Sequence, residues 1–479
     1  MQYKLIIVLA CFVTSTICAT SGSTLKNQAS TLLDQLNSQK MDVILFWNAV
    51  LIRAGANDYD TSIVATPDQA GPTTTSRAFA IIHGAMYEAM NAFERTYKPL
   101  FNFINMPKTN DVLSNPAVEA AVTAAAYQTL VSLYPTQKTL FDEAQSGFLN
   151  TRKKDLLSQL ATVRGTAVGY LVASTILSNR RSDHSQDKGV YTPIMQPGYH
   201  QADPTHPSQS FLSPQWGNVK PFVIRSGSQF RASNIVGQNV AQRLQYINSQ
   251  NYINDYNEVV RLGSLNSAYR TADQTEIGIF WGYDGAPKIG VPPRLYNQVV
   301  RVIAIQKKNT VQQNARLFAL ANYAMADAAI SAWESKYYYG LWRPIVAIRQ
   351  GTRNTRSIPN WLPLGAPADG SGINFTPGFP SYVSGHATFG GAVFGILRLF
   401  YGTDTMKFQL QSDEYNGITK DSVTNKIRPV RTRYYQSFTQ AEDENFLSRI
   451  YLGVHWRLDQ EAGRTMGRQI ASYVFTQNN

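Results

Sequence analysis

The chain has 479 residues, of which 43% are hydrophobic and 16% are charged, and its formal net charge is +12 at pH 7. This length can form one large domain or two packed domains with substantial cores. The charge favours anionic partners, but the basic residues are scattered and form no zinc-finger, RNA-recognition or Walker-type pattern, so we expect no nucleic-acid partner.

Residues 1–19 have the layout of a secretory signal peptide. MQYK is followed by the apolar LIIVLACFV and by small residues at Thr16, Cys18 and Ala19. Because Cys11 and Cys18 are the two cysteines of the chain, a mature protein cleaved near Ala19 would have no thiol nucleophile and no thiolate metal site. No later stretch has about 18 uninterrupted apolar residues, so we expect a secreted protein without stable membrane insertion.

Helical periodicity dominates the remaining chain and predicts an all-α fold. Apolar residues at spacings of three and four occur in Ala117–Leu133, Leu156–Leu177, Ala315–Tyr338 and Ala387–Phe400. Strand-like alternation is limited to short stretches such as Phe222–Ile224, which could pair locally. We expect two packed helical bundles, an N-terminal region over residues 20–220 and a C-terminal region over residues 221–479 that contains the active site.

Two long segments are too irregular for helices, because Gly189–Gly217 and Gly351–Pro380 each contain five prolines. The first segment is either an ordered loop over the helical body or a boundary between two helical halves. The second leads into the C-terminal motifs. Since long loops inside compact enzymes often line sites, we expect it to form part of the active-site entrance.

A first basic motif begins at Lys336, in the last turn of the helical pattern that ends at Tyr338. In KYYYGLWRP, Lys336 and Arg343 are seven residues apart, close to two helical turns, so both side chains can project from one face before Pro344 perturbs the helix. Taken alone, the pair reads as two solvated basic residues on an exposed helix.

A second motif, FPSYVSGHATFGGAVFGILRLF, places Ser384, Gly385 and His386 directly before an apolar run. A serine and a glycine at a helix start present a hydroxyl, free backbone N–H groups and the positive end of the helix dipole, which together can hold an anion. The alternative is an ordinary serine N-cap followed by a partly buried histidine.

A third motif, SRIYLGVHWRLDQ, contains Arg449 and His455 six residues apart. This spacing puts the two side chains on different faces of a continuous helix, so they can converge only if the helix breaks near Gly453. The alternative is a surface arginine and an unrelated histidine.

The three motifs together predict a site for an oxyanion with several oxygens. Lys336, Arg343 and Arg449 supply three cations, Ser384 and Gly385 supply neutral donors, and two histidines remain for chemistry. Each charge-assisted hydrogen bond could contribute ~1.5 to 3 kcal/mol. Without the anion, the three gathered cations would repel one another.

In these motifs the sequence resembles the vanadium-dependent haloperoxidases and the related acid and lipid phosphate phosphatases. The haloperoxidase branch is favoured because Trp333 and Phe379 occupy positions where chloroperoxidase-like members carry the aromatic pair of the halide site. Weaker similarity extends through Ala78–Glu94 and Pro214–Phe222, and so covers most of the mature chain. Val383 replaces the proline that usually precedes Ser-Gly-His, a change that removes no functional group.

The resemblance implies roles for each motif. Vanadate is the implied cofactor, and His455 would bind its vanadium through a ring nitrogen. Its oxygens would be held by Lys336, Arg343, Ser384, Gly385 and Arg449. His386 would be the acid–base residue, and Lys336 would polarise the bound peroxide. The implied reaction uses hydrogen peroxide to oxidise chloride or bromide to hypohalous acid, which reacts with a small organic acceptor.

Carboxylates near the third motif have several possible roles. The family pairs its arginine with an upstream aspartate, and Asp273 and Asp284 are both candidates. Asp459 could orient His455 from behind, although a structural salt bridge on the same helix is the more common arrangement at this spacing. The other four histidines lie outside the three motifs: His83, His184, His200 and His206.

Two other functions use the same residues. In a phosphomonoesterase, His455 would attack phosphorus to form a phosphohistidine and His386 would protonate the leaving oxygen, while the anion site would stay unchanged. The Trp333 and Phe379 pair favours halide chemistry over this alternative. A binding or storage protein with an inherited anion pocket is a third interpretation, but it predicts the loss of a chemical residue, and all are present.

Overall fold

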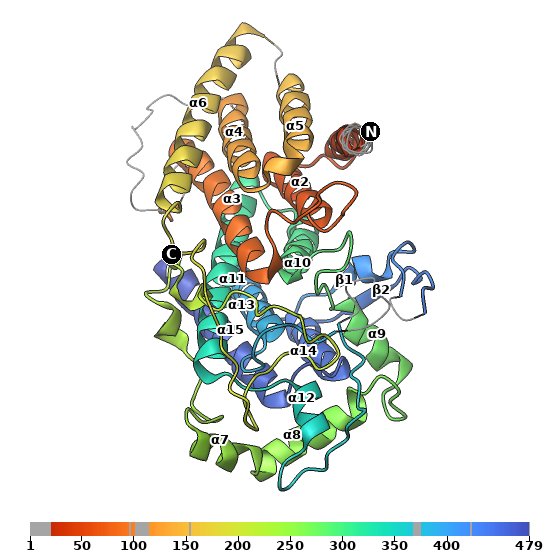
Figure 1. Ribbon diagram of the computed structural model, residues 1–479. Helices are drawn as coiled ribbons and strands as arrows, with labels where there is room; N and C mark the ends of the chain where they lie inside the picture. Colours follow the sequence, from red (N-terminus) through yellow and green to blue (C-terminus); the bar gives the residue numbers. More distant parts are fainter. Residues whose placement is uncertain are drawn as a thin grey trace, which may run out of the picture. The chain divides into compact units, whose positions relative to one another are not determined.

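The computed structural model describes residues 21–94, 97–100, 115–152, 155–366, 375–421 and 424–478, and the expected signal peptide lies outside these residues. The described chain is mainly helical (Figure 1), which confirms the predicted all-α class. It forms two compact units: unit 1 contains residues up to 70, 81–180 and 309–316, and unit 2 contains residues 71–80, 181–308 and 317–479. The chain crosses between the two units at residues 70/71, 80/81, 180/181, 308/309 and 316/317, whereas the sequence predicts a single boundary at residue 220.

Unit 1 is a bundle around α4. Its helices are residues 21–38, α2 (Val43–Asn57), most of α3 (Gly71–Glu94), α4 (Asn115–Leu133), α5 (Lys138–Asn150) and α6 (Leu156–Asn179). Helix α4 contacts α2, α5 and α6. The approach of α6 to α4 needs glycine, because a Cβ atom at Gly165 would lie 2.0 Å from the carbonyl oxygen of Ala117.

Helix α6 is also the one helix of the described chain with the length and apolar composition needed to cross a membrane, and 39% of its apolar window is buried.

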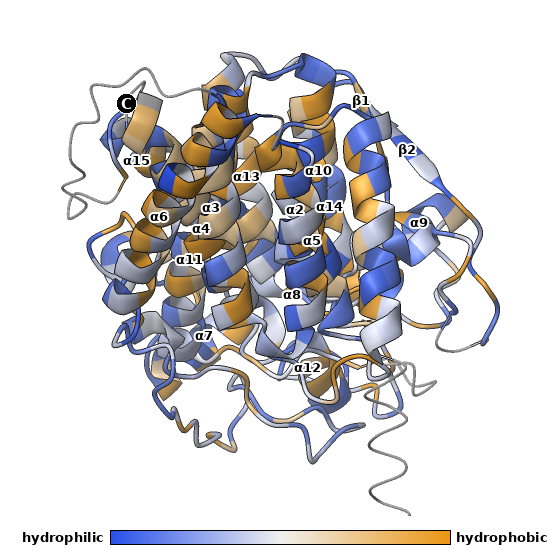
Figure 2. Ribbon diagram, turned by 90° about the horizontal axis from the view of Figure 1, so that it is seen from above, coloured by the Kyte–Doolittle hydropathy of each residue, from blue (hydrophilic) through white to orange (hydrophobic). Residues whose placement is uncertain are grey.

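Unit 2 contains the helices of the three predicted motifs. They are α7 (Val240–Ile247), α8 (Gln250–Leu262), α9 (Ala272–Phe280), α10 (Pro292–Lys307), most of α11 (Val311–Tyr339), α12 (Pro344–Gln350), α13 (Gly385–Tyr401), α14 (Phe438–Tyr451) and α15 (Arg457–Gln477). The two strands of the described chain, β1 (Phe408–Gln411) and β2 (Thr432–Tyr435), pair antiparallel. Figure 2 shows the contrast between the apolar α13 and the more polar α8.

Helices α13 and α15 form the core of unit 2 at very close range. A Cβ atom at Gly467 would lie 2.2 Å from the carbonyl oxygen of Thr388, and one at Gly463 would lie 2.7 Å from that of Ser384. This approach brings the start of α13 to the start of α15, where the Ser384 N–H donates to the carbonyl oxygen of Asp459 at 2.9 Å. The second and third motifs are therefore held together by backbone contact.

The expected local strand at Phe222–Ile224 is wrong. The N–H groups of residues 222, 223 and 224 donate to the carboxylate of Asp327 at 2.7, 2.8 and 2.9 Å. The Asp327 side chain is fully buried. A buried carboxylate takes the place of a neighbouring strand here, because it satisfies three consecutive backbone donors at once.

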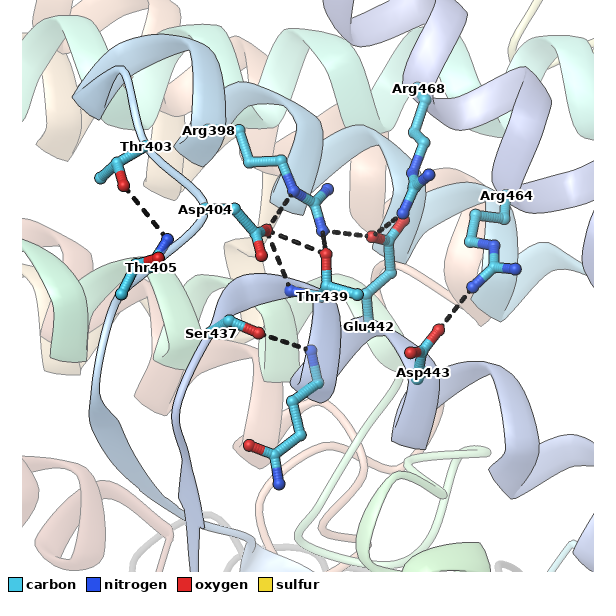
Figure 3. Close-up of polar contacts among 11 residues, drawn as sticks. Arg398, Thr403, Asp404, Thr405, Ser437, Thr439, Glu442, Asp443, Arg464 and Arg468 are labelled. Carbon is cyan, nitrogen blue, oxygen red and sulfur yellow. Dashed lines mark hydrogen bonds and ion pairs between the residues drawn. The ribbon is translucent and has the colours of Figure 1, made fainter.

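A buried carboxylate also joins three helices of unit 2. Figure 3 shows Glu442 of α14 between Arg398 of α13 and Arg468 of α15, and its Oε2 atom lies 2.6 Å from both guanidinium groups. The nearby pair between Asp443 and Arg464 is also 2.6 Å long, but its side chains are 50% and 27% exposed, against 1% for Glu442.

The Glu442→Gln variant is expected to lose about 3 kcal/mol of unfolding free energy, the lower end of the range for breaking a buried ion pair. The lower end applies because the Arg468 side chain is 45% exposed. The control Asp443→Asn is expected to lose about 1 kcal/mol or less, as surface pairs do. Urea denaturation followed by circular dichroism measures both, and equal losses would show that burial of Glu442 adds nothing.

Candidate active site

The predicted site residues are buried, which overturns their interpretation as solvated surface groups. The exposed fractions are 0% for Lys336 and Ser384, 1% for Arg343 and Arg449, 2% for His455 and 6% for His386. Gly385 is buried at the start of α13. Burial of three cations without water costs free energy unless other groups compensate, so the surroundings of each side chain decide the chemistry.

Lys336 and Arg343 converge, although they do not lie on one helix as expected. Helix α11 ends at Tyr339, and Gly340 follows with a φ of +60°. Lys336 Nζ donates to the carbonyl oxygens of Pro380 and Ser381 at 2.8 and 3.2 Å, and Arg343 Nε donates to that of Phe379 at 2.8 Å. The segment before the Ser-Gly-His motif therefore brings both cations together.

The start of α13 has the predicted cap. Ser384 is the N-cap residue, and its hydroxyl accepts from the Ala387 N–H at 3.4 Å. A Cβ atom at Gly385 would lie 3.4 Å from the Trp333 ring. The helix dipole and the backbone N–H groups at this end thus lie beside the predicted aromatic pair.

The predicted break between Arg449 and His455 is confirmed. Helix α14 ends at Tyr451, and Gly453 has a φ of +72°. A side chain at this position would also clash, because a Cβ atom would lie 2.4 Å from the carbonyl oxygen of Gly263. His455 lies between α14 and α15 and belongs to neither helix. Its side chain is therefore not confined to a helix face and contacts Arg343.

The hydrogen bonds of His455 define its protonation. Arg343 Nη1 lies 2.9 Å from His455 Nε2, and a guanidinium can only donate, so Nε2 carries a lone pair. Nδ1 lies 3.0 Å from Asp459 Oδ2, to which it donates. Burial, followed by the charges of Arg343 and Lys336, lowers the pKa of His455 well below its usual value. The ring is therefore neutral and presents Nε2 to the cations.

Asp459 orients His455, which was the less favoured of its two predicted roles. The expected salt bridge within one helix is wrong, because His455 lies before α15. Asp459 Oδ2 also accepts from the Ser381 hydroxyl and from the Trp456 N–H, the latter at 3.0 Å. Burial raises the pKa of Asp459. Ser381, which joins this network, carried no signal in the sequence.

His386 lies on the first turn of α13. Its Nε2 atom is 2.7 Å from the carbonyl oxygen of Gly282. Nε2 therefore carries the proton, and Nδ1 is the unprotonated nitrogen of the neutral ring. Burial, followed by the charge of Arg449, lowers the pKa of His386 well below its usual value. The ring can accept a proton at Nδ1 without losing its hydrogen bond to the backbone.

Arg449 pairs with Asp284, which decides between the two predicted candidates. Its Nη2 atom donates to both carboxylate oxygens of Asp284, at 2.9 and 3.0 Å. The Asp284 side chain is 7% exposed. Asp273 instead pairs with Arg433 and is 67% exposed. The buried carboxylate leaves the other side of the Arg449 guanidinium to a ligand.

Trp333 and Phe379 form an aromatic pair beside the cations, with ring centroids 4.8 Å apart. Lys336 Nζ lies 4.8 Å from the Phe379 centroid and 5.6 Å from that of Trp333. The guanidinium carbon of Arg343 is also 4.8 Å from the Phe379 centroid. The two predicted rings thus lie against the cationic groups of the site.

The donors of the pocket fit an oxyanion. Among the described residues, Arg343 Nη2, Arg449 Nε and Arg449 Nη1 are buried and have no hydrogen-bond partner. Buried guanidinium donors are rarely left unpaired, so this set indicates a ligand with several acceptor oxygens. The described chain has no group of three His, Cys, Asp or Glu side chains arranged for a metal ion. A metal held here as its own oxyanion needs only the lone pair of His455.

Comparisons with known proteins show similarity of sequence and of fold. A family model described as the second helical-bundle domain of VCPO matches residues 316–479. The vanadium chloroperoxidase of Curvularia inaequalis is 31% identical over 502 residues, which cover 90% of this chain and 81% of that protein.

Two solved structures share the fold. A bacterial vanadium-dependent iodoperoxidase has a TM-score of 0.70 at 24% identity, covering 89% of this chain and 95% of that chain. The holo form of a bacterial vanadium-dependent chloroperoxidase has a TM-score of 0.65 at 16% identity, covering 86% of this chain and 93% of that chain.

Proposed function

The chain belongs to the vanadium haloperoxidase family and is a peroxidase, and we propose that it binds vanadate and uses hydrogen peroxide to oxidise chloride or bromide to hypohalous acid. A small organic molecule accepts the halogen. The observation that carries this proposal is the set of three buried guanidinium nitrogens of Arg343 and Arg449 that have no partner, together with the His455 lone pair that Arg343 contacts.

The cationic groups divide the work of holding the anion. Arg343 and Arg449 would hold its oxygens through three buried donor nitrogens that have no other partner, and Ser384 and Gly385 would add the start of α13. Lys336, with two of its protons donated to backbone carbonyls, has a third for an oxygen of the ligand. Bound vanadate would supply a Lewis-acid centre that activates peroxide, and the oxidation state of the vanadium would not change.

His455 and His386 have different tasks in this proposal. His455 presents Nε2 as a metal ligand, and Asp459 holds the opposite nitrogen so that the ring cannot turn. His386 is anchored through Nε2 to the backbone and accepts or returns a proton at Nδ1. The halide would approach along Trp333 and Phe379, whose ring edges carry partial positive charge.

We expect added vanadate to give purified apo-protein peroxide- and bromide-dependent halogenation, because the unpaired donors of Arg343 and Arg449 can bind its oxygens. Turnover is measured with a phenol acceptor, against vanadate without protein and against protein without vanadate. Phosphate should inhibit loading, since it is also a tetrahedral oxyanion.

A phosphomonoesterase would give the opposite pattern. It would release phosphate from an ester through a phosphohistidine at His455, and it would show no halogenation with bound vanadium. That result would replace the proposed function while leaving the anion site unchanged.

A further inference from the structure

One histidine outside the three motifs is joined through its backbone to the segment between two cations of the site. The N–H of His200 donates to the carbonyl oxygen of Gly340 at 2.8 Å, and Tyr199 pairs with Leu341. Gly340 and Leu341 belong to the short segment that joins Lys336 to Arg343. The backbone of His200 is therefore held against the segment that positions two of the anion-binding cations.

The side chain of His200 is buried without a partner. The residue is 2% exposed, and both of its ring nitrogens lack a hydrogen-bond partner among the described residues. Its ring lies 5.4 Å from that of Phe211 and 5.8 Å from that of Tyr191, measured between centroids. Buried polar atoms are nearly always paired, so two unpaired nitrogens on one ring indicate a missing ligand.

One loop contacts both the His200 ring and Trp333. Leu212, the neighbour of Phe211, accepts hydrogen bonds at its carbonyl oxygen from Trp333 Nε1 at 3.2 Å and from the Tyr337 hydroxyl at 2.7 Å. His200 and Trp333 are therefore held by adjacent residues of one loop. Burial and then the charges of Arg343 and Lys336 lower the pKa of His200 well below its usual value, which keeps the ring neutral.

The neutral imidazole of His200, which is influenced by the charges of Arg343 and Lys336, has one N–H group to offer. Three features of these surroundings suit a halide ion: nearby positive charge, aromatic ring edges and a single neutral donor. Peroxide is a less suitable ligand for the His200 N–H group. Its oxygens would lie at the guanidinium groups, because these supply unpaired donors of their own.

We propose that His200 is a specificity-determining residue that donates an N–H hydrogen bond to the halide held beside Trp333 and Lys336. This inference rests on the proposed function, because it names a further contact of the same substrate. It predicts that binding of the halide depends on this ring, whereas binding of peroxide and of vanadate does not.

Two substitutions separate the hydrogen bond from the shape of the ring. His200→Phe keeps an aromatic ring without a donor, and His200→Gln keeps a side-chain N–H group. The control His184→Asn removes an imidazole that is 60% exposed and pairs with Asp187. Asparagine is chosen there because His184 has a φ of +68°.

In vanadate-loaded enzyme, His200→Phe is expected to raise KM for bromide about tenfold, the ratio for losing one hydrogen bond to an anion. KM for peroxide and the vanadium content should stay at the wild-type values, and the content also reports correct folding. His200→Gln should recover most of the loss, and His184→Asn should match the wild type. An unchanged KM for bromide, or a change in KM for peroxide alone, would overturn the assignment.

Crystals of the wild type soaked in bromide give a readout independent of turnover. An anomalous peak within hydrogen-bonding distance of a His200 ring nitrogen, absent in His200→Phe, would support the inference even if wild-type turnover failed and the proposed function fell. Active wild-type enzyme without that peak would overturn the inference and leave the proposed function intact.

Discussion

Replacing His455 with alanine is expected to reduce peroxide-dependent halogenation to the level of free vanadate. The variant loses the ring nitrogen that presents its lone pair to Arg343, because Nε2 of His455 lies 2.9 Å from Arg343 Nη1. The unpaired donors of Arg343 and Arg449 remain, so vanadate should still bind loosely. The variant therefore separates the contribution of the His455 ligand to vanadate binding from that of the charged arginine donors.

The measurement for His455→Ala is vanadium stoichiometry together with turnover on each preparation. The exposed His184→Asn variant serves as the control for loss of an imidazole, and it should retain both values. Full activity in His455→Ala would rule out this residue as the ligand and, with it, the proposed mechanism.

Replacing His386 with alanine is expected to lower turnover by about 10² to 10⁴-fold, the usual contribution of a positioned acid–base group. Bound vanadate should remain at the wild-type stoichiometry, because His386 donates through Nε2 to the carbonyl oxygen of Gly282 and does not anchor the anion. The loss should therefore appear in kcat, measured with saturating vanadate, peroxide and bromide.

The comparison of the two histidine variants is decisive for their assignment. If His386→Ala lost vanadium and His455→Ala retained it, the two roles would be exchanged. If both variants lost the same fraction of vanadium and activity, neither residue would have the separate task proposed for it.

Local sequence rules were sufficient for much of the fold and for the local geometry around the predicted site residues. The periodic stretches are helices, Ser384 caps α13, and the chain breaks at Gly453 between Arg449 and His455. These features depend on near neighbours in the chain: a hydroxyl that accepts from a helical N–H, or a residue that tolerates a positive φ. Such rules act within about one helical turn and need no knowledge of the fold.

Pairs of residues that are distant in the chain could be identified only from the tertiary structure. Asp284 and Asp273 are equivalent upstream of Arg449 in the sequence, yet only Asp284 is buried beside it, 165 residues away. His200 had no motif and acquires its place because its loop pairs with the segment between Lys336 and Arg343.

Asp459 illustrates the same division within a short span. Its spacing from His455 fits a salt bridge along a helix. Because α15 begins two residues after His455, the Asp459 carboxylate instead accepts from Nδ1 of His455 and orients the ring. The sequence thus specified which groups can donate, accept or carry charge, whereas their pairing followed from packing. The close approach of α13 to α15, made possible by Gly463 and Gly467, brings the motifs together at the distances that chemistry requires.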